Sequence, residues 1–131
     1  MWAGGMIGAF PMTDPFTIEK APGYVSVTFS GLFTFEAAKR SIDTMVEACA
    51  KERCTRVLFD CRPMTGPLTV MNRFDVAEYG ASVVPDSLKV AMLGRADQIL
   101  PDRFLENVAR NRGMRMTLFT DLGEAIAWLA E

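Results

Sequence analysis

The chain has 131 residues, half of them hydrophobic and 23% charged, which fits one globular domain with one core. A net charge of −2 provides no cationic field for nucleic acid or anionic lipid, and the absence of histidine removes the usual general base and the commonest metal ligand. The three cysteines lack a CxxC spacing, so we expect neither a metal site nor a disulfide framework.

Residues 1–12 form an apolar, glycine-rich stretch without Lys or Arg. They lack the charged start of a signal peptide and are too short to span a bilayer. We expect a loose N-terminal arm, residues 1–12, before one domain, residues 13–131. Two alternatives stay open, a start at Met6 or Met12 and an arm whose apolar side chains dock on a partner.

The first half of the domain predicts a hairpin followed by a helix. Residues 16–20 and the alternating residues 24–30 read as antiparallel strands around a Pro-Gly turn. Thr34 is the expected N-cap of the helix. The buried stripe of this helix is expected to hold Ile42, Met45, Val46 and Cys49.

The second half predicts strands at residues 56–61, 88–93 and 114–119, with helices between and after them. A helix after Pro67 is expected to bury Val70, Phe74, Ala77 and Ala81. A third helix is expected over residues 97–112, with Gly113 as its C′ residue. A last helix, capped by Asp121 and Glu124, is expected to bury Leu122, Ile126 and Leu129.

The order ββαβαβαβα predicts an α/β fold with a mostly parallel five-stranded sheet whose first strand is antiparallel. One phase of the strands is continuously apolar, and the other mixes polar and apolar side chains. The main helices are therefore expected on one face of the sheet. The other face is then solvated, thinly covered or used by a partner.

Two motifs carry a family resemblance: VLFDCRPMTGP after the third strand and DLGEAIAWL at the last helix. With the element order, they resemble the SpoIIAA-like (STAS/SEC14-like) family of the STAS superfamily over residues 16–131. The resemblance implies a small cytoplasmic regulatory domain that is not an enzyme and needs no cofactor. Anti-sigma antagonists of this kind are phosphorylated on a serine in Asp-Ser-Ser-Gly, and here only Thr65, before Gly66, stands in that place. The SEC14-like label also suggests an apolar or lipid ligand.

The loop after the third strand is the candidate site. Asp60 lies at the carboxyl end of that strand, Arg62 follows it, and Arg95 follows the next one. All three are therefore expected at the carboxyl edge of the sheet, where ligands usually bind. One interpretation is an anion held by Arg62 and Arg95 with Thr65 and backbone N–H groups. The other is structural: Asp60 accepts bonds within its own turn and pairs with Arg62. Cys61 has the inward phase and no histidine as a base, so no catalytic residue is expected.

The second helix carries more apolar surface than one stripe needs, including Met71 and Phe74. This surface predicts a pocket cover or a two-fold interface, and we expect a homodimer slightly more than a monomer. The favoured function is a non-catalytic protein-interaction module that uses Asp60, Arg62, Thr65 and the second helix. The alternatives are an apolar-ligand or lipid binder lined by Met71 and Phe74, and a phosphorylation switch at Thr65.

Overall fold

The structure is a computed structural model that describes residues 14–100 and 103–131. The predicted arm, residues 1–12, lies outside the described residues. The strands are β1 (Phe16–Ala21), β2 (Tyr24–Phe29), β3 (Gly31–Leu32), β4 (Arg56–Asp60), β5 (Met64–Thr65), β6 (Lys89–Leu93) and β7 (Arg115–Phe119). The helices are α1 (Phe35–Glu52), α2 (Val70–Val83), the 3₁₀ helix η2 (Ala96–Gln98), α3 (Phe104–Asn111) and α4 (Leu122–Ala130).

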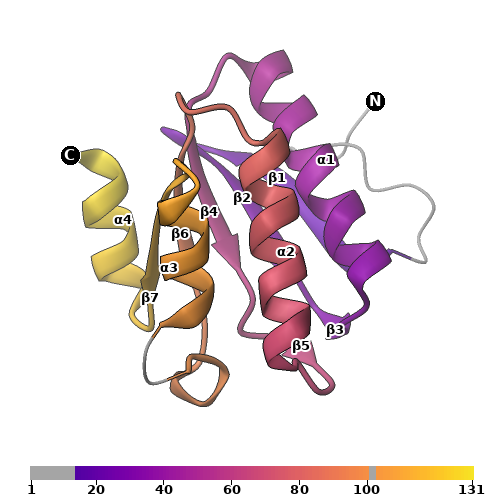
Figure 1. Ribbon diagram of the computed structural model, residues 1–131. Coiled ribbons are helices and arrows are strands. Elements are labelled where there is room, and N and C mark those ends of the chain that lie inside the picture. Colours follow the sequence, from indigo (N-terminus) through magenta and orange to yellow (C-terminus); the bar gives the residue numbers. More distant parts are fainter. Residues whose placement is uncertain (1–13, 101–102) are drawn as a thin grey trace.

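The main sheet has five strands in the order β1-β2-β4-β6-β7 (Figure 1). β1 pairs with β2 antiparallel, and every later neighbour is parallel. The register aligns one apolar row across the sheet, with Val25 beside Val57, Val57 beside Val90 and Val90 beside Met116. The predicted mostly parallel five-stranded sheet with an antiparallel first strand is confirmed.

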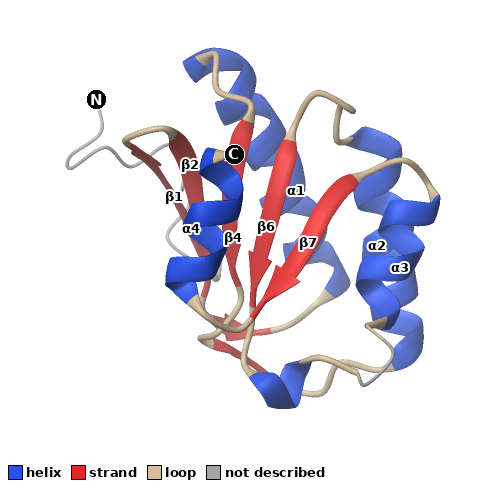
Figure 2. Cartoon of the chain, turned by 90° about the vertical axis from the view of Figure 1, so that its left-hand side faces the viewer, coloured by secondary structure: helices blue, strands red, loops and turns tan. Residues whose placement is uncertain are grey.

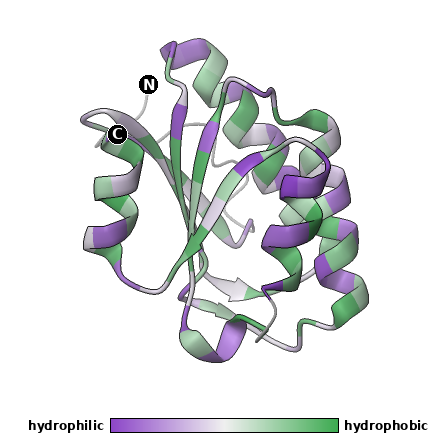
Figure 3. Ribbon diagram, turned by 60° about the vertical axis from the view of Figure 1, so that its left-hand side comes forward, coloured by the Kyte–Doolittle hydropathy of each residue, from purple (hydrophilic) through white to green (hydrophobic). Residues whose placement is uncertain are grey.

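The apolar phase of the strands forms the main core with α1, α2 and α3. Val25, Val27 and Val57 are fully buried. Figure 3 shows hydrophobic residues along the strands and the helices of this layer. Each such side chain contributes about 1.5–3 kcal/mol of burial free energy. Thr34 caps α1 by accepting from the backbone N–H of Ala37, as the sequence predicted.

The opposite face of the sheet is covered by α4, which packs on β4, β6 and β7 (Figure 2). This second, smaller cluster consists of Leu58, Ala91, Leu93, Ala125 and Leu129. The sequence left three alternatives for this face, which were exposure to solvent, thin cover and contact with a partner. The structure supports thin cover. The prediction that Leu122 is buried is wrong, because it lies in the first turn of α4 and is 40% exposed.

Lys89 anchors the far end of α4. Its ammonium group donates to the backbone oxygen of Trp128 over 2.6 Å and lies 4.5 Å from the centre of the Trp128 ring. A cation at the carboxyl end of a helix also complements the helix dipole. The polar phase of β6 therefore ties the second layer to the sheet.

Two helices differ from the prediction. The stripe that α2 buries is Arg73, Ala77 and Gly80, so the prediction is confirmed for Ala77 and wrong for Val70, Phe74 and Ala81. The small residues let α2 pack between α1 and α3, while Val70 is 53% exposed. The third helix is shorter than predicted. Among the described residues of this stretch, η2 covers Ala96–Gln98 and α3 covers Phe104–Asn111. The sequence between them contains a proline, which lacks the N–H that a helix interior requires.

Candidate functional site

The carboxyl edge of the sheet gathers the predicted site residues. Asp60 ends β4, Arg62 follows it, and Arg95 follows β6. The same edge carries the short β3–β5 sheet and η2, at the lower end of the molecule in Figure 2. The convergence of the loops after β4 and β6, expected from parallel topology, is present.

Asp60 and Arg62 form one closed unit. Asp60 Oδ1 accepts the backbone N–H of Arg62 at 3.0 Å and its Nε at 3.1 Å, and Asp60 Oδ2 accepts Nη2 at 2.9 Å. The hydrogen bonds to Asp60 raise the pKa of Arg62. This arrangement matches the structural interpretation, in which the Asp60 carboxylate pairs with the Arg62 guanidinium.

Arg95 joins the two loops. Its guanidinium donates to the backbone oxygens of Arg62 and, over 3.3 Å, of Met64. Two further bonds reach Asp97, at 3.0 and 3.3 Å, and lower the pKa of that carboxyl. The side chain is still 44% exposed, so Arg95 is both a brace for the loop and a surface group.

Thr65 lies in β5, which pairs in parallel with β3 and was not predicted. Gly31 is opposite Met64, and Leu32 is opposite Thr65. The backbone oxygen of Thr65 accepts the N–H of Phe33 at 2.9 Å, while the residue itself is exposed. A phosphate on Thr65 would therefore reach solvent, and its role as a phosphoacceptor stays a prediction.

The first turn of α2 is capped by Thr69, four residues after Thr65. Thr69 accepts the N–H of Asn72, and the Asn72 side chain accepts the N–H of Thr69, both at 3.0 Å. This reciprocal cap satisfies two otherwise free donors. Sequence reasoning missed it because Asn replaces the usual Glu or Gln. Thr65 therefore lies outside α2, four residues before its N-cap.

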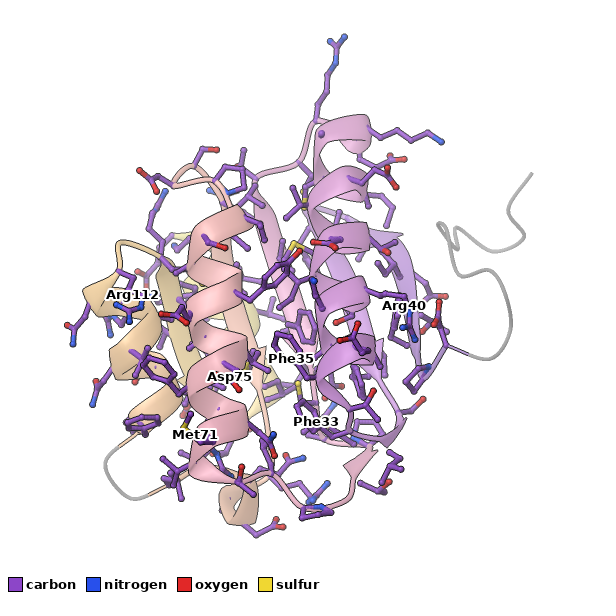
Figure 4. All side chains as sticks on the ribbon, turned by 45° about the vertical axis from the view of Figure 1, so that its right-hand side comes forward. Phe33, Phe35, Arg40, Met71, Asp75 and Arg112 are labelled. Atoms are coloured by element: carbon purple, nitrogen blue, oxygen red, sulfur yellow. The ribbon has the colours of Figure 1, made fainter. Side chains whose placement is uncertain are left out.

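Large exposed hydrophobic side chains collect at this carboxyl edge. Among the described residues they are Leu32 at 61%, Val70 at 53%, Met71 at 63% and Leu122 at 40% exposure. Each follows or ends a strand at that edge, and Figure 4 shows Met71 at the lower end of α2. We call Leu32, Val70 and Met71 the apolar rim.

Phe74 and Met71 differ in their surroundings. Phe74 is half-buried and its ring lies 5.5 Å from the Arg112 guanidinium of the α3 C-cap. Neither Phe74 nor Met71 lines the cavity beneath α2, and an apolar ligand held by these two residues stays a prediction. Arg73, between them in sequence, faces that cavity instead. Their role in binding a partner stays a prediction.

Cys49 and Cys61 are not poised for chemistry. Burial, and then the charge of Asp60, raise the pKa of Cys61 to about 12. Burial also raises the pKa of Cys49 to about 12. A thiol with so high a pKa is a poor nucleophile near neutral pH. Within residues 14–100 and 103–131, no three His, Cys, Asp or Glu side chains group as metal ligands would.

Arg73 is the charged residue that sequence reasoning missed. It is 8% exposed and hydrogen bonds to the backbone oxygens of Leu68 and Gln98. Burial lowers its pKa. Ala77 and Gly80, four and seven positions later, share a helix face with Arg73, and their small side chains were the signal for this buried stripe. The prediction instead followed the larger apolar residues Val70 and Phe74.

Comparison with known proteins places the fold. No protein-family model matches the sequence, and no curated protein matches it. An anti-sigma factor antagonist from Mycobacterium paratuberculosis has a similar structure, with a TM-score of 0.58 and 12% sequence identity, over 88% of this chain and 93% of that one. This likeness confirms the predicted SpoIIAA-like, STAS-type fold.

None of the helices within residues 14–100 and 103–131 is long and apolar enough to cross a membrane.

Proposed function

We propose that this chain is a non-catalytic regulatory module of the cytoplasm that binds a protein partner through the carboxyl edge of its sheet. The observation that carries the proposal is the apolar rim, Leu32, Val70 and Met71, in which each side chain is more than half exposed. Exposed apolar groups gathered on one edge and bordered by polar side chains are typical of protein-binding surfaces.

The border of the rim supplies the polar part of the proposed interface. Arg62 and Arg95, with 43% and 44% of their side chains exposed, are fixed by Asp60 and Asp97. Fixed arginines lose less conformational freedom on binding than free ones, and arginine is enriched at interfaces. An acidic or carbonyl-rich segment of the partner would fit this border.

The structural neighbour supports a protein as the partner, since an anti-sigma factor antagonist is named for its action on another protein. A second copy of this chain is the alternative partner. The raised pKa values of Cys49 and Cys61 support a role without covalent catalysis.

A photo-crosslinking amino acid at Met71 identifies the partner directly. The captured protein is then purified and titrated against the wild type, Met71→Asp and the control Ser87→Asp. Ser87 is also exposed but precedes β6, at the other edge of the sheet. We expect Met71→Asp to weaken binding at least about tenfold, which is 1.4 kcal/mol, and Ser87→Asp to leave it nearly unchanged. Equal affinity of the three folded proteins would exclude this edge as the interface.

Sedimentation of the purified protein separates the two partner classes. A dimer that Met71→Asp dissociates makes the second copy the partner. A monomer that still captures a protein through position 71 makes the partner a different chain.

The exposed position of Thr65 beside Leu32 favours a switch within the same surface. A phosphate there adds nearly two negative charges next to an apolar side chain, which opposes apolar docking. Thr65→Glu is therefore expected to weaken the interaction and Thr65→Val to preserve it. Unchanged binding of both variants would remove Thr65 from the proposal.

A further inference from the structure

A cavity lies between the main sheet and α1, α2 and α3. Its volume is about 100 Å³, and its walls are almost entirely apolar. The lining includes Ile42, Phe59, Ala77, Gly80, Met114 and Met116. An engineered cavity of about 150 Å³ with similar walls binds benzene or xenon, so this space suits a group of about four or five carbon atoms.

One wall of the cavity leaves room beside Gly80. A Cβ placed there would meet Met114 Sδ at 3.8 Å and Ile42 Cδ1 at 3.9 Å, which is ordinary van der Waals contact. The glycine therefore leaves room for a methyl group at this wall.

The cavity has a polar end at Arg73. The guanidinium lines the cavity and donates to the backbone oxygen of Gln98 at 2.7 Å and to that of Leu68. No carboxylate of the described residues forms an ion pair with it, in contrast to the other arginines of this edge. A guanidinium carries five N–H donors, so these two bonds leave capacity for a further acceptor.

The neighbouring arginines make the contrast clear. Arg62 is paired with Asp60, and Arg95 with Asp97, at the exposed surface. Arg103 also lines the cavity, but its Nε lies 2.6 Å from Glu106. Arg73 is the most buried of these arginines and the one without its own carboxylate among the described residues. A buried cation without a counter-ion is costly, and proteins usually provide a partner.

We propose that Arg73 and the cavity form a binding site for a small monocarboxylate, with the carboxylate on the guanidinium and a short apolar tail in the cavity. The planar guanidinium matches the two oxygens of a carboxylate. The carbonyl oxygens of Leu68 and Gln98 beside the same guanidinium disfavour a doubly charged phosphate ester. This site is separate from the apolar rim and goes beyond the interaction module.

The first test needs only the wild-type chain. Valerate is titrated against the protein, with valeramide, 1-pentanol and pentyl phosphate as comparison ligands that have the same five-carbon chain. Methionine methyl resonances report the cavity, since Met64, Met114 and Met116 line it. We expect saturable shifts with valerate, at an affinity at least about tenfold higher than for the neutral ligands.

Substitutions then locate the charge. Arg73→Met is expected to abolish the preference for valerate over valeramide, whereas the matched variant Arg62→Met preserves it. Gly80→Val, which fills part of the cavity, is expected to weaken all these ligands together. If Arg73→Met does not fold, the acid and amide comparison on the wild type still decides.

Three results would overturn the proposal. They are the absence of saturable shifts with any of these ligands, equal affinity for valerate and valeramide, and tighter binding of pentyl phosphate than of valerate. Preference for valerate that persists in a folded Arg73→Met protein would also overturn it, because the anion would then bind elsewhere.

Discussion

Leu32 occupies the space that a side chain on Gly66 would need. A Cβ built on Gly66 would lie 2.5 Å from Leu32 Cδ1. Gly66 also has φ +92°, a conformation that other residues rarely adopt. The position of the Leu32 side chain, one member of the apolar rim, therefore depends on the missing side chain of Gly66.

Replacing Gly66 with alanine is expected to destabilise the fold by about 1–3 kcal/mol, from backbone strain and from the displacement of Leu32. Urea unfolding measures this loss. Gly23→Ala is the matched control, since Gly23 has φ +88° but no atom within 4 Å of the added Cβ. The loss of unfolding free energy in Gly66→Ala beyond that in Gly23→Ala measures the steric conflict with Leu32. Equal losses in both variants would show that Leu32 moves aside without cost.

Gly80→Ala is expected to have the opposite sign. Gly80 is helical, and its added Cβ would meet only Met114 and Ile42 at 3.8 Å or more. Alanine in a helix interior is favoured over glycine by about 0.5–1 kcal/mol, and the extra methyl group fills part of the cavity. The midpoint of urea unfolding should therefore rise. A lower midpoint would mean that α2 packs closer to α1 and α3 in solution.

Acid is expected to destabilise the protein through Glu106. Burial by itself would raise the pKa of this carboxyl, but hydrogen bonds from Arg103 and from the Leu118 N–H, with the charges of Arg103 and Arg110, lower it below 4.5. Because the folded pKa is below the unfolded one, this stabilisation is complete above the unfolded pKa. It is lost as the pH falls through the folded pKa.

Glu106→Gln is expected to lose about 1–3 kcal/mol at pH 7 and to show a flatter stability curve below pH 4.5. Unfolding free energies measured from pH 3 to 7 give both values. Glu78→Gln is the control, because Glu78 pairs with Arg112 at the surface and is 54% exposed. Parallel curves for wild type and Glu106→Gln would assign the acid sensitivity to another carboxyl.

Cys49 and Cys61 are expected to resist alkylation in the folded protein. With a pKa of about 12, about one Cys61 side chain in ten thousand is a thiolate at pH 8. Iodoacetamide followed by intact and peptide mass spectrometry measures the labelling, and the denatured chain provides the fully labelled control. Rapid native labelling of Cys61 would reopen the nucleophile interpretation that its inward phase argued against.

The fold was predictable because the strands repeat one physical pattern. Val25, Val57 and Val90 lie in phase with each other, so a single apolar row specifies which face meets the helices. Thr34 and Gly113 mark helix ends through local chemistry, which a sequence states directly. Tertiary packing was harder to predict from the sequence. The polarity of the residues around Arg73 does not indicate that this charged side chain is buried.

The location of the candidate site was predictable from the sequence, but the hydrogen bonds within it were not. Parallel topology brings Asp60, Arg62 and Arg95 to one edge, whatever their partners. That Asp97 pairs with Arg95 depends on η2, whose three residues leave little periodicity to recognise. The β3–β5 pair was missed for the same reason, because strands of two residues have no alternating pattern.

The order of the strands in space follows their order in the chain. During synthesis, each new strand of the main sheet can therefore pair with the edge left by the one before it, without waiting for a later segment to be inserted between them. Contacts that close between successive segments favour rapid folding. The face that carries Leu58, Ala91 and Leu93 is the exception, since it stays open to water, and to other nascent chains, until α4 has been made.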